Sequence, residues 1–128
     1  MDEQRVTQVI DLLRLAAERE RLVPYKRFHF LFDKASPLRT RYDVLETAVR
    51  RLAEPRWVDY GALLASENGL PGDEFFSRIK ATRRSEYDRI MGVGTCGRSV
   101  TRRRTLAEAE RARVFAYAQQ VSVAGASR

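Results

Sequence analysis

The segment Ser36-Pro-Leu-Arg-Thr-Arg-Tyr-Asp-Val-Leu-Glu-Thr-Ala-Val-Arg-Arg-Leu52 carries the clearest structural pattern in this 128-residue chain. A serine followed by proline is a typical helix start, because the serine oxygen accepts a free backbone N–H and proline fits the first turn. Apolar residues then recur every three or four positions, which places them on one helical face. The pattern predicts a helix over 37–53, with an apolar stripe formed by Leu38, Tyr42, Leu45, Val49 and Leu52.

The same spacing before this segment predicts further helices, so we expect a mainly α fold. An amphipathic helix is expected over 4–21. Residues 25–32 also have helical spacing, but every second residue from 28 to 32 is phenylalanine, which permits a strand instead. The aromatic side chains of this stretch are expected in the core, although exposed ones would offer a platform on which bases stack.

Three shorter helices are expected between residues 57 and 91. Asp59 is placed to cap the first of them, and Gly69 to end it. Pro71 begins the second, whose first turn contains two acidic residues that suit the helix dipole. A weaker third helix starts at Ser85. The buried face of the second helix is expected to consist of Phe75, Phe76 and Ile79.

The C-terminal part combines a glycine-rich segment with one long helix. Residues 92–104 contain three glycines and little apolar periodicity, so we expect a loop or a hairpin there. Thr105 and Glu108 form a capping box, which predicts that the last helix starts here and continues to about residue 120. Residues 124–128 are expected to fray. The packed side of the helix is expected to contain Leu106, Ala109, Ala112, Phe115 or Ala116, and Gln119.

These elements predict one small domain over residues 1–123, a bundle of five or six helices. Helix-turn-helix or winged-helix organisation, with a short hairpin near 92–104, is the more specific form of this prediction. Apolar residues make up 44% of the chain, which is ordinary for a globular domain. The apolar runs are too short to cross a bilayer, and the acidic, polar start at Met1 does not resemble a secretory signal. Cys96 is the only cysteine, which fits a reducing compartment, so we expect a cytoplasmic protein.

The charge is strongly positive and unevenly distributed. The chain has 24 Lys and Arg against 17 Asp and Glu, a net charge of +7. Residues 77–104 contain 9 basic and 2 acidic residues, and residues 25–57 have a net charge of +4. Such blocks attract polyanions, and arginine makes bidentate contacts to phosphate. The sequence therefore predicts a nucleic-acid partner, DNA in preference to RNA, whose phosphates are held by Arg78, Lys80, Arg83, Arg84, Arg98, Arg102, Arg103 and Arg104.

Helical geometry supports this assignment by placing residues 80, 83 and 84 on one face, away from the predicted core. A loop over 92–104 that presents its arginines beside this face would form a track for phosphates and bind in a salt-sensitive way. If the protein reads a base sequence, the helix begun by Pro71 is the candidate for the groove, and symmetric half-sites would require a homodimer. A solvated polar face, or a genome rich in arginine codons, explains the same charge without a nucleic acid, so this alternative stays open.

The segment Gly92-Val-Gly-Thr-Cys-Gly-Arg-Ser99 matches the G-x-G-x-x-G pattern of nucleotide-binding loops. Those loops follow a strand and lead directly into a helix, whereas a helix is expected before this segment and the next one only at Thr105. Arg98 also stands where the related phosphate loop requires lysine. We therefore expect no nucleotide hydrolysis, and instead a flexible loop that presents arginines.

The segment Trp57-Val-Asp-Tyr-Gly-Ala-Leu-Leu-Ala65, followed by Gly69-Leu-Pro71, resembles the opening of the alkyltransferase-like DNA-binding domain, V-x-Y-G-x-L-A…G-x-P. This resemblance implies a helix-turn-helix unit that binds DNA. In that family a reactive cysteine follows, with proline before it and histidine and arginine after it. Cys96 is preceded by threonine and followed by glycine, a departure that puts alkyl transfer in doubt.

Residues suited to catalysis are scarce. His29 is the only histidine, so neither a histidine–cysteine metal set nor a histidine-based triad can form within one chain. Asp73 and Glu74 are adjacent and point in different directions on a helix, which does not suit a catalytic pair. We therefore expect a non-enzymatic protein with no metal and no cofactor.

A protein–protein interaction module is the alternative function. Residues 58–76 contain 4 acidic and no basic residues, so the chain has an acidic and a basic part. Such a protein can act as an adaptor or an inhibitor that docks on an acidic or nucleic-acid-binding surface of its partner. Binding of labelled nucleic acid over a salt series separates the two functions, because only the first predicts affinity that falls linearly with log salt.

Overall fold

Helix α3 (Leu38–Leu52) forms from the segment with the clearest apolar spacing, within one residue of its predicted bounds. Its cap residue is Pro37, which has an extended backbone, rather than Ser36. Leu38, at the start of the predicted stripe, is exposed. The buried face of the helix consists of Val44, Leu45, Ala48 and Val49.

The computed structural model describes residues 1–95 and 97–126, with side chains up to residue 123. That part of the chain forms six α-helices, one short 3-10 helix and a two-stranded sheet, which confirms the predicted mainly α fold. The elements in chain order are α1 (Glu3–Glu18), β1 (Val23–Pro24), α2 (Tyr25–His29), α3 (Leu38–Leu52), η1 (Tyr60–Leu63), β2 (Leu64–Ala65), α4 (Asp73–Thr82), α5 (Arg84–Met91) and α6 (Val100–Ala126).

The short sheet joins two segments that are distant in the sequence. β1 and β2 are parallel, with Val23 opposite Leu64 and Pro24 opposite Ala65. Parallel neighbours need a long crossover, which α2 and α3 provide here. The helical interpretation of the stretch after Pro24 is confirmed by α2, and the strand is limited to the two residues before it.

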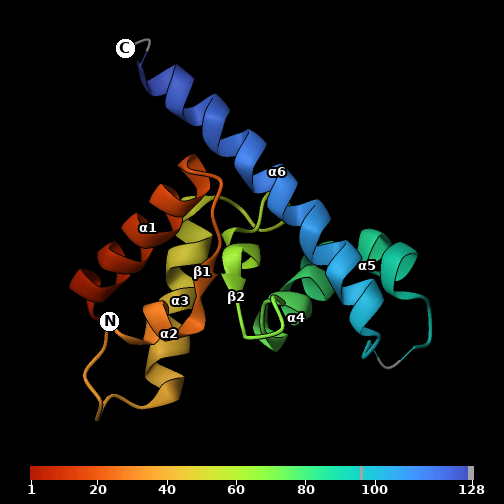
Figure 1. Ribbon diagram of the computed structural model, residues 1–128, viewed down its shortest axis with the longest axis horizontal. Helices are drawn as coiled ribbons and strands as arrows, with labels where there is room; N and C mark the ends of the chain where they lie inside the picture. Colours follow the sequence, from red (N-terminus) through yellow and green to blue (C-terminus); the bar gives the residue numbers. More distant parts are fainter. Residues whose placement is uncertain (96, 127–128) are drawn as a thin grey trace.

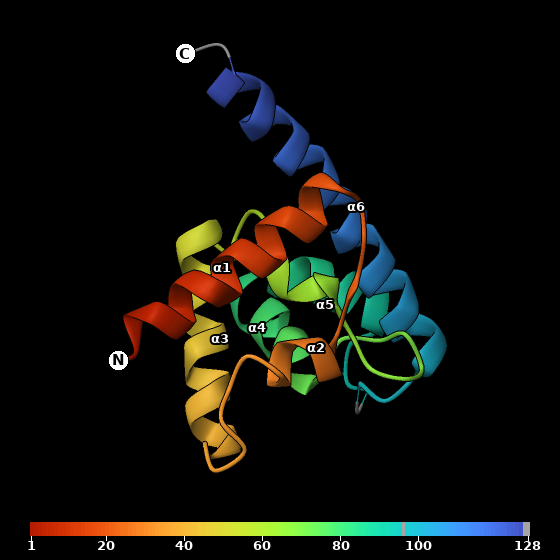
Figure 2. The same cartoon turned by 60° about the vertical axis from the view of Figure 1, so that its left-hand side comes forward.

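α6 connects two groups of helices. In Figure 1, α1, α2 and α3 lie on one side of the molecule and α4 and α5 on the other, while α6 runs across both. Its C-terminal end projects beyond the other helices in this view and in Figure 2. One apolar cluster lies among α1, α3 and η1, and the other lies between α4 and α5. α6 contributes Val114 and Ala118 to the first cluster and Leu106 to the second.

The predicted start of the last helix is wrong. α6 begins at Val100, and Ser99 caps it: its hydroxyl oxygen accepts the backbone N–H of Arg102 over 3.3 Å. Thr105 lies inside the helix and donates its hydroxyl hydrogen to the Thr101 carbonyl oxygen over 3.1 Å. Among the described residues of 92–104 there is no strand, so the structure has no hairpin in that part. Helical residues extend to Ala126, while 127–128 of the predicted frayed tail lie outside the described residues.

The packed face of α6 also differs from the prediction. Ala109, Ala112, Ala116 and Gln119 are exposed. The buried positions instead follow a four-residue spacing, and two of them are charged, which explains why an apolar pattern failed to identify this face. They are Leu106, Ala107, Glu110, Arg111, Val114 and Ala118.

Candidate functional site

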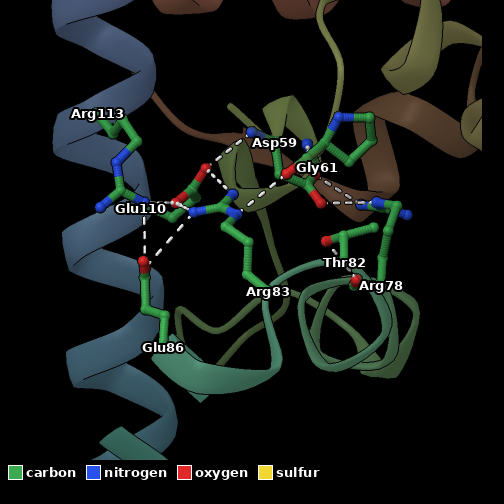
Figure 3. Close-up of polar contacts among 9 residues, drawn as sticks. Asp59, Gly61, Arg78, Thr82, Arg83, Glu86, Glu110 and Arg113 are labelled. Atoms are coloured by element: carbon green, nitrogen blue, oxygen red, sulfur yellow. Dashed lines mark hydrogen bonds and ion pairs between the residues drawn. The ribbon is translucent and has the colours of Figure 1, made fainter. Parts of the chain in front are cut away.

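Two of the predicted phosphate-binding arginines lie inside the protein. Figure 3 shows Arg78 from α4 and Arg83 from the α4–α5 junction beside carboxylates. Arg78 is only 4% exposed. Guanidinium groups that are enclosed and occupied in this way are not free to hold the phosphates of a polymer in solvent. We therefore leave both arginines out of the candidate nucleic-acid surface.

Arg78 forms a bidentate ion pair with Asp59. Its Nε and Nη2 donate to the two carboxylate oxygens over 2.7 and 2.8 Å, and its Nη1 donates to Glu46 over 2.8 Å. Asp59 is fully buried and, as predicted, caps η1 by accepting the Gly61 N–H over 2.8 Å. Burial lowers the pKa of Arg78, but the hydrogen bonds and charges of Asp59 and Glu46 outweigh it, so the pKa is raised and the side chain stays charged.

Arg83 leaves the helical path because its backbone is not helical, with φ −141° and ψ 62°. Its side chain turns inward, where two nitrogens donate to the carboxylate of Glu110 over 2.7 and 2.6 Å. Glu110 also accepts the backbone N–H of Asp59 over 2.7 Å and pairs with Arg113. This carboxylate therefore ties α6 to the α4–α5 junction and to the segment that precedes η1.

Gly61 is needed for the close approach of Arg78. A Cβ built on Gly61 would overlap Arg78 Nη2 and lie 2.9 Å from Asp59 Oδ1. Arg78 cannot move aside without losing its buried ion pair. We therefore expect Gly61→Ala to lower the free energy of unfolding by about 1–3 kcal/mol, the usual cost of overpacking. Urea unfolding followed by circular dichroism measures this loss of stability, and an unchanged midpoint would contradict the expected overlap. In Gly94→Ala a Cβ meets no atom within 4 Å, but the φ of Gly94 is +76°. That variant therefore measures the cost of a positive φ without any overlap.

The three consecutive arginines at the start of α6 are held by nearby backbone carbonyls. Arg102 donates to the Met91 oxygen over 2.8 Å, and Arg104 donates to the Asn68 oxygen over 2.9 Å. Arg103 donates to the Gly97 oxygen over 2.7 Å, pairs with Asp73, and stacks 4.5 Å from the Phe76 ring. These contacts attach the glycine-rich loop and the 66–70 turn to α6, so the three side chains have a structural role.

Lys80, Arg84 and Arg98 are exposed, and so is Arg102. Lys80 Nζ lies 5.7 Å from the ring centre of Tyr87, and a Cβ on Gly97 would lie 2.6 Å from the Tyr87 hydroxyl, which brings the loop at Arg98 to the same ring. Arg84 lies one turn before Tyr87 on α5 and pairs with Asp88 at the surface over 3.1 Å. Lys80 therefore packs beside Tyr87, and the loop that precedes Arg98 approaches the same ring.

An open pocket beside Arg84 contains residues that sequence reasoning missed. It has a volume of about 560 Å³. Trp57 forms part of its wall and is 65% exposed, and the Arg56 guanidinium lies 5.1 Å from the tryptophan ring centre. Arg56 pairs with the exposed Glu54, and Arg84 pairs with Asp88, which is half-buried. An arginine followed by the only tryptophan, after a helix-ending proline, was the signal that could have found this site.

The other residues that the sequence singled out do not line the pocket at Trp57. His29 packs against Phe28 and Tyr42, and burial and the charge of Arg41 lower its pKa. Phe28 is in the core, as expected, whereas Phe30 is exposed. The glycine-rich loop follows helix α5 rather than a strand. Cys96 lies outside the described residues.

No family model, curated protein or solved structure matches this chain. Within the ranges 1–95 and 97–126, no helix is both long enough and apolar enough to span a membrane. In the same ranges, no three His, Cys, Asp or Glu side chains are grouped so that they could hold a metal ion.

Proposed function

We propose that this protein is a non-enzymatic nucleic-acid-binding protein, and that it takes single-stranded DNA on the surface around Trp57. The observation that carries the proposal is an exposed tryptophan in the wall of an open pocket, with two solvent-facing arginines beside it. Trp57 is the largest π-surface that a side chain can offer, and an exposed position leaves its ring available for a base. Because bases in a duplex are already stacked on one another, this surface favours a single strand.

Arg56 and Arg84 supply the phosphate contacts of the proposal. Their present partners, Glu54 and Asp88, form surface ion pairs, which contribute little free energy and exchange readily. A phosphate that replaces such a partner accepts two hydrogen bonds from one guanidinium. The nucleotide next to the stacked base would therefore be held by its charge, whatever its base.

Lys80 and Arg98 extend this surface along α5. Neither side chain has a carboxylate partner among the described residues. A strand that leaves the Trp57 pocket past Arg84 would meet these two cations next to Tyr87. Each neutralised phosphate releases a counterion, so we expect log affinity to fall linearly with log salt concentration.

The sole tryptophan gives a direct test. Single-stranded DNA is expected to quench the fluorescence of Trp57 on binding, and Trp57→Ala is expected to weaken binding about tenfold in fluorescence anisotropy with labelled DNA. Arg84→Ala should flatten the salt dependence by about one phosphate contact. Phe30→Ala is the matched control, because it removes another exposed aromatic ring that does not line this pocket. Quenching that is absent at low salt, or equal affinity of Trp57→Ala and wild type, would refute the proposal.

Helix-turn-helix binding to duplex DNA is the more specific form of the same function. α4 and α5 are consecutive helices joined only by Arg83, and Lys80 lies on the exposed side of α4. In this form α4 enters the major groove, and symmetric half-sites require a homodimer. A preference for duplex over single-stranded DNA, with Trp57→Ala silent, would favour it over the strand-binding surface. Docking on an acidic protein partner, the alternative function, has support from a different surface.

A further inference from the structure

A second open hollow lies between the outer face of α1 and the β1–α2 segment. Two adjoining pockets of about 560 and 420 Å³ share Leu12, Pro24 and Arg27 in their walls and therefore form one groove. The groove shares no lining residue with the pocket at Trp57.

The sequence of α1 explains the apolar floor of this groove. Its core-facing residues are Val6, Val9, Leu13 and Ala17, which belong to the main apolar cluster. A second stripe, at positions 12, 15 and 16, has the same helical spacing but faces the groove. Leu15 and Leu22 are about two-fifths exposed. α1 therefore has two apolar faces, and its own fold covers only one of them completely.

Phe30 stands at the edge of the groove and is 88% exposed. It follows α2 directly, whereas Phe28, two residues earlier, is fully buried. An exposed phenylalanine ring keeps apolar surface in contact with water, and burial against a partner would remove that contact. An exposed ring beside an uncovered apolar groove is typical of an anchor at a protein interface.

The rim of the groove is entirely basic. Arg19, Arg21, Lys26 and Arg27 line it, and no acidic residue does. In the described part of the chain, none of these four side chains has an ion-pair or hydrogen-bond partner. They differ in this from most arginines of α4 and α6, which are held by carboxylates or carbonyls. The groove therefore combines uncovered apolar surface with four unpaired cations.

We propose that this groove binds an acidic amphipathic helix of a partner protein. A helix that presents apolar side chains at i, i+3, i+4 and i+7 fills an elongated hollow, and Asp or Glu beside that stripe would meet the four cations. Phe30 is the apolar anchor, and Arg27, which borders both pockets, is the central charge contact. This inference does not depend on the proposed DNA surface.

Two other occupants fit the groove less well. A lipid surface is flat and requires apolar side chains that project together, whereas Leu12 and Pro24 line hollows. A second copy of this chain lacks a suitable segment: its acidic stretch 58–76 contains Asp59, which is buried, and the exposed end of α6 from 119 to 123 has no carboxylate. An acidic amphipathic helix matches both the apolar floor and the charged rim.

The test uses the full chain and a fluorescein-labelled peptide of about four helical turns, with leucine along one face and glutamate on the rest. Anisotropy is expected to show micromolar binding that weakens with salt. Phe30→Ala should weaken it about tenfold, and so should Arg27→Glu. Both side chains are exposed, so circular dichroism should show the wild-type fold. A peptide with lysine in place of glutamate should not bind wild type, but should gain affinity for Arg27→Glu.

Trp57→Ala is the control that separates the two surfaces, because it should leave peptide binding unchanged. Four outcomes would overturn the inference. The acidic peptide does not bind, the lysine peptide binds wild type equally well, Phe30→Ala has no effect, or the chain binds anionic phosphatidylserine vesicles in place of the peptide. Dimerisation of the wild type that Phe30→Ala abolishes, measured by light scattering, would assign the groove to a second copy instead. Loss of DNA binding with peptide binding retained would refute only the proposed function.

Discussion

Arg78→Ala is expected to lower the free energy of unfolding by about 3–5 kcal/mol, because it leaves a buried carboxylate without its counter-charge. Asp59 is fully buried, and both of its oxygens accept hydrogen bonds from Arg78. After the substitution, that carboxylate keeps the hydrogen bond that it accepts from the Gly61 N–H. The loss far exceeds the removal of one side chain from a surface, since the desolvation cost of Asp59 remains while its compensation disappears.

Arg50→Ala is the matched control for this experiment. Arg50 pairs with the same Glu46 that Arg78 contacts, over the same distance of 2.8 Å, but its side chain is exposed. Surface pairs of this kind contribute at most about 1 kcal/mol. Urea unfolding followed by circular dichroism should therefore show a large shift of the midpoint for Arg78→Ala and a small one for Arg50→Ala. Equal shifts of the two midpoints would show that burial of the Arg78–Asp59 pair does not increase its contribution to the free energy of unfolding.

Glu110→Ala is expected to destabilise the protein by a similar amount, about 3–5 kcal/mol, which corresponds to a fall in Tm of roughly 10–20 °C for a domain of this size. Glu110 is fully buried in the middle of α6 and accepts hydrogen bonds from Arg83, Arg113 and the backbone N–H of Asp59. Removing it leaves the buried Asp59 N–H unsatisfied. The two guanidinium groups then share Glu86, which pairs with Arg83 over 3.5 Å and with Arg113 over 3.1 Å.

Glu108→Ala controls for the loss of a glutamate from the same helix, because Glu108 is exposed. Differential scanning calorimetry should show a Tm close to wild type for Glu108→Ala and a strongly lowered Tm for Glu110→Ala. High salt should rescue little of the difference, since ions screen buried pairs poorly. A Tm shift of the same size for both variants would contradict the role assigned to Glu110.

The position of these ion pairs explains their expected effect. Glu110 lies one turn after Leu106, which belongs to the α4–α5 cluster, and one turn before Val114, which belongs to the α1–α3 cluster. The ion pairs therefore stand where the two apolar clusters meet along α6. Breaking them is expected to loosen both groups of helices together, so unfolding should remain a single transition.

The charge of the chain does not reveal which of its cations are enclosed and which are exposed. Of the eight cations predicted to hold phosphates, Arg78 and Arg83 are enclosed by carboxylates, and Arg102 to Arg104 hold the loops beside α6. A count of charges cannot distinguish these uses, because arginine has the same charge in an ion pair as in solvent. The distinction depends on carboxylates distant in the sequence, such as Glu110, which lies 27 residues from Arg83.

Helix positions, by contrast, could be predicted well wherever the apolar spacing is regular. α1, α3, α4 and α5 all lie close to their predicted ranges, because a helix is formed by hydrogen bonds and side-chain spacing within a few residues. α6 departed from its prediction at its start, which is Val100 rather than Thr105, and on its packed face. Glu110 and Arg111 occupy its buried face, so the apolar rule selected the wrong side.

The sequence by itself determined the mainly α class, the order of the helices and the excess of positive charge, since each follows from local spacing or from composition. Tertiary structure alone decided which cations form ion pairs in the interior and which remain exposed to solvent. It also decided that Trp57 and Phe30 stay exposed on two separate hollows while Phe28 is buried. The physical reason is that burial and ion pairing depend on partners brought together by folding, and no short stretch of sequence contains those partners.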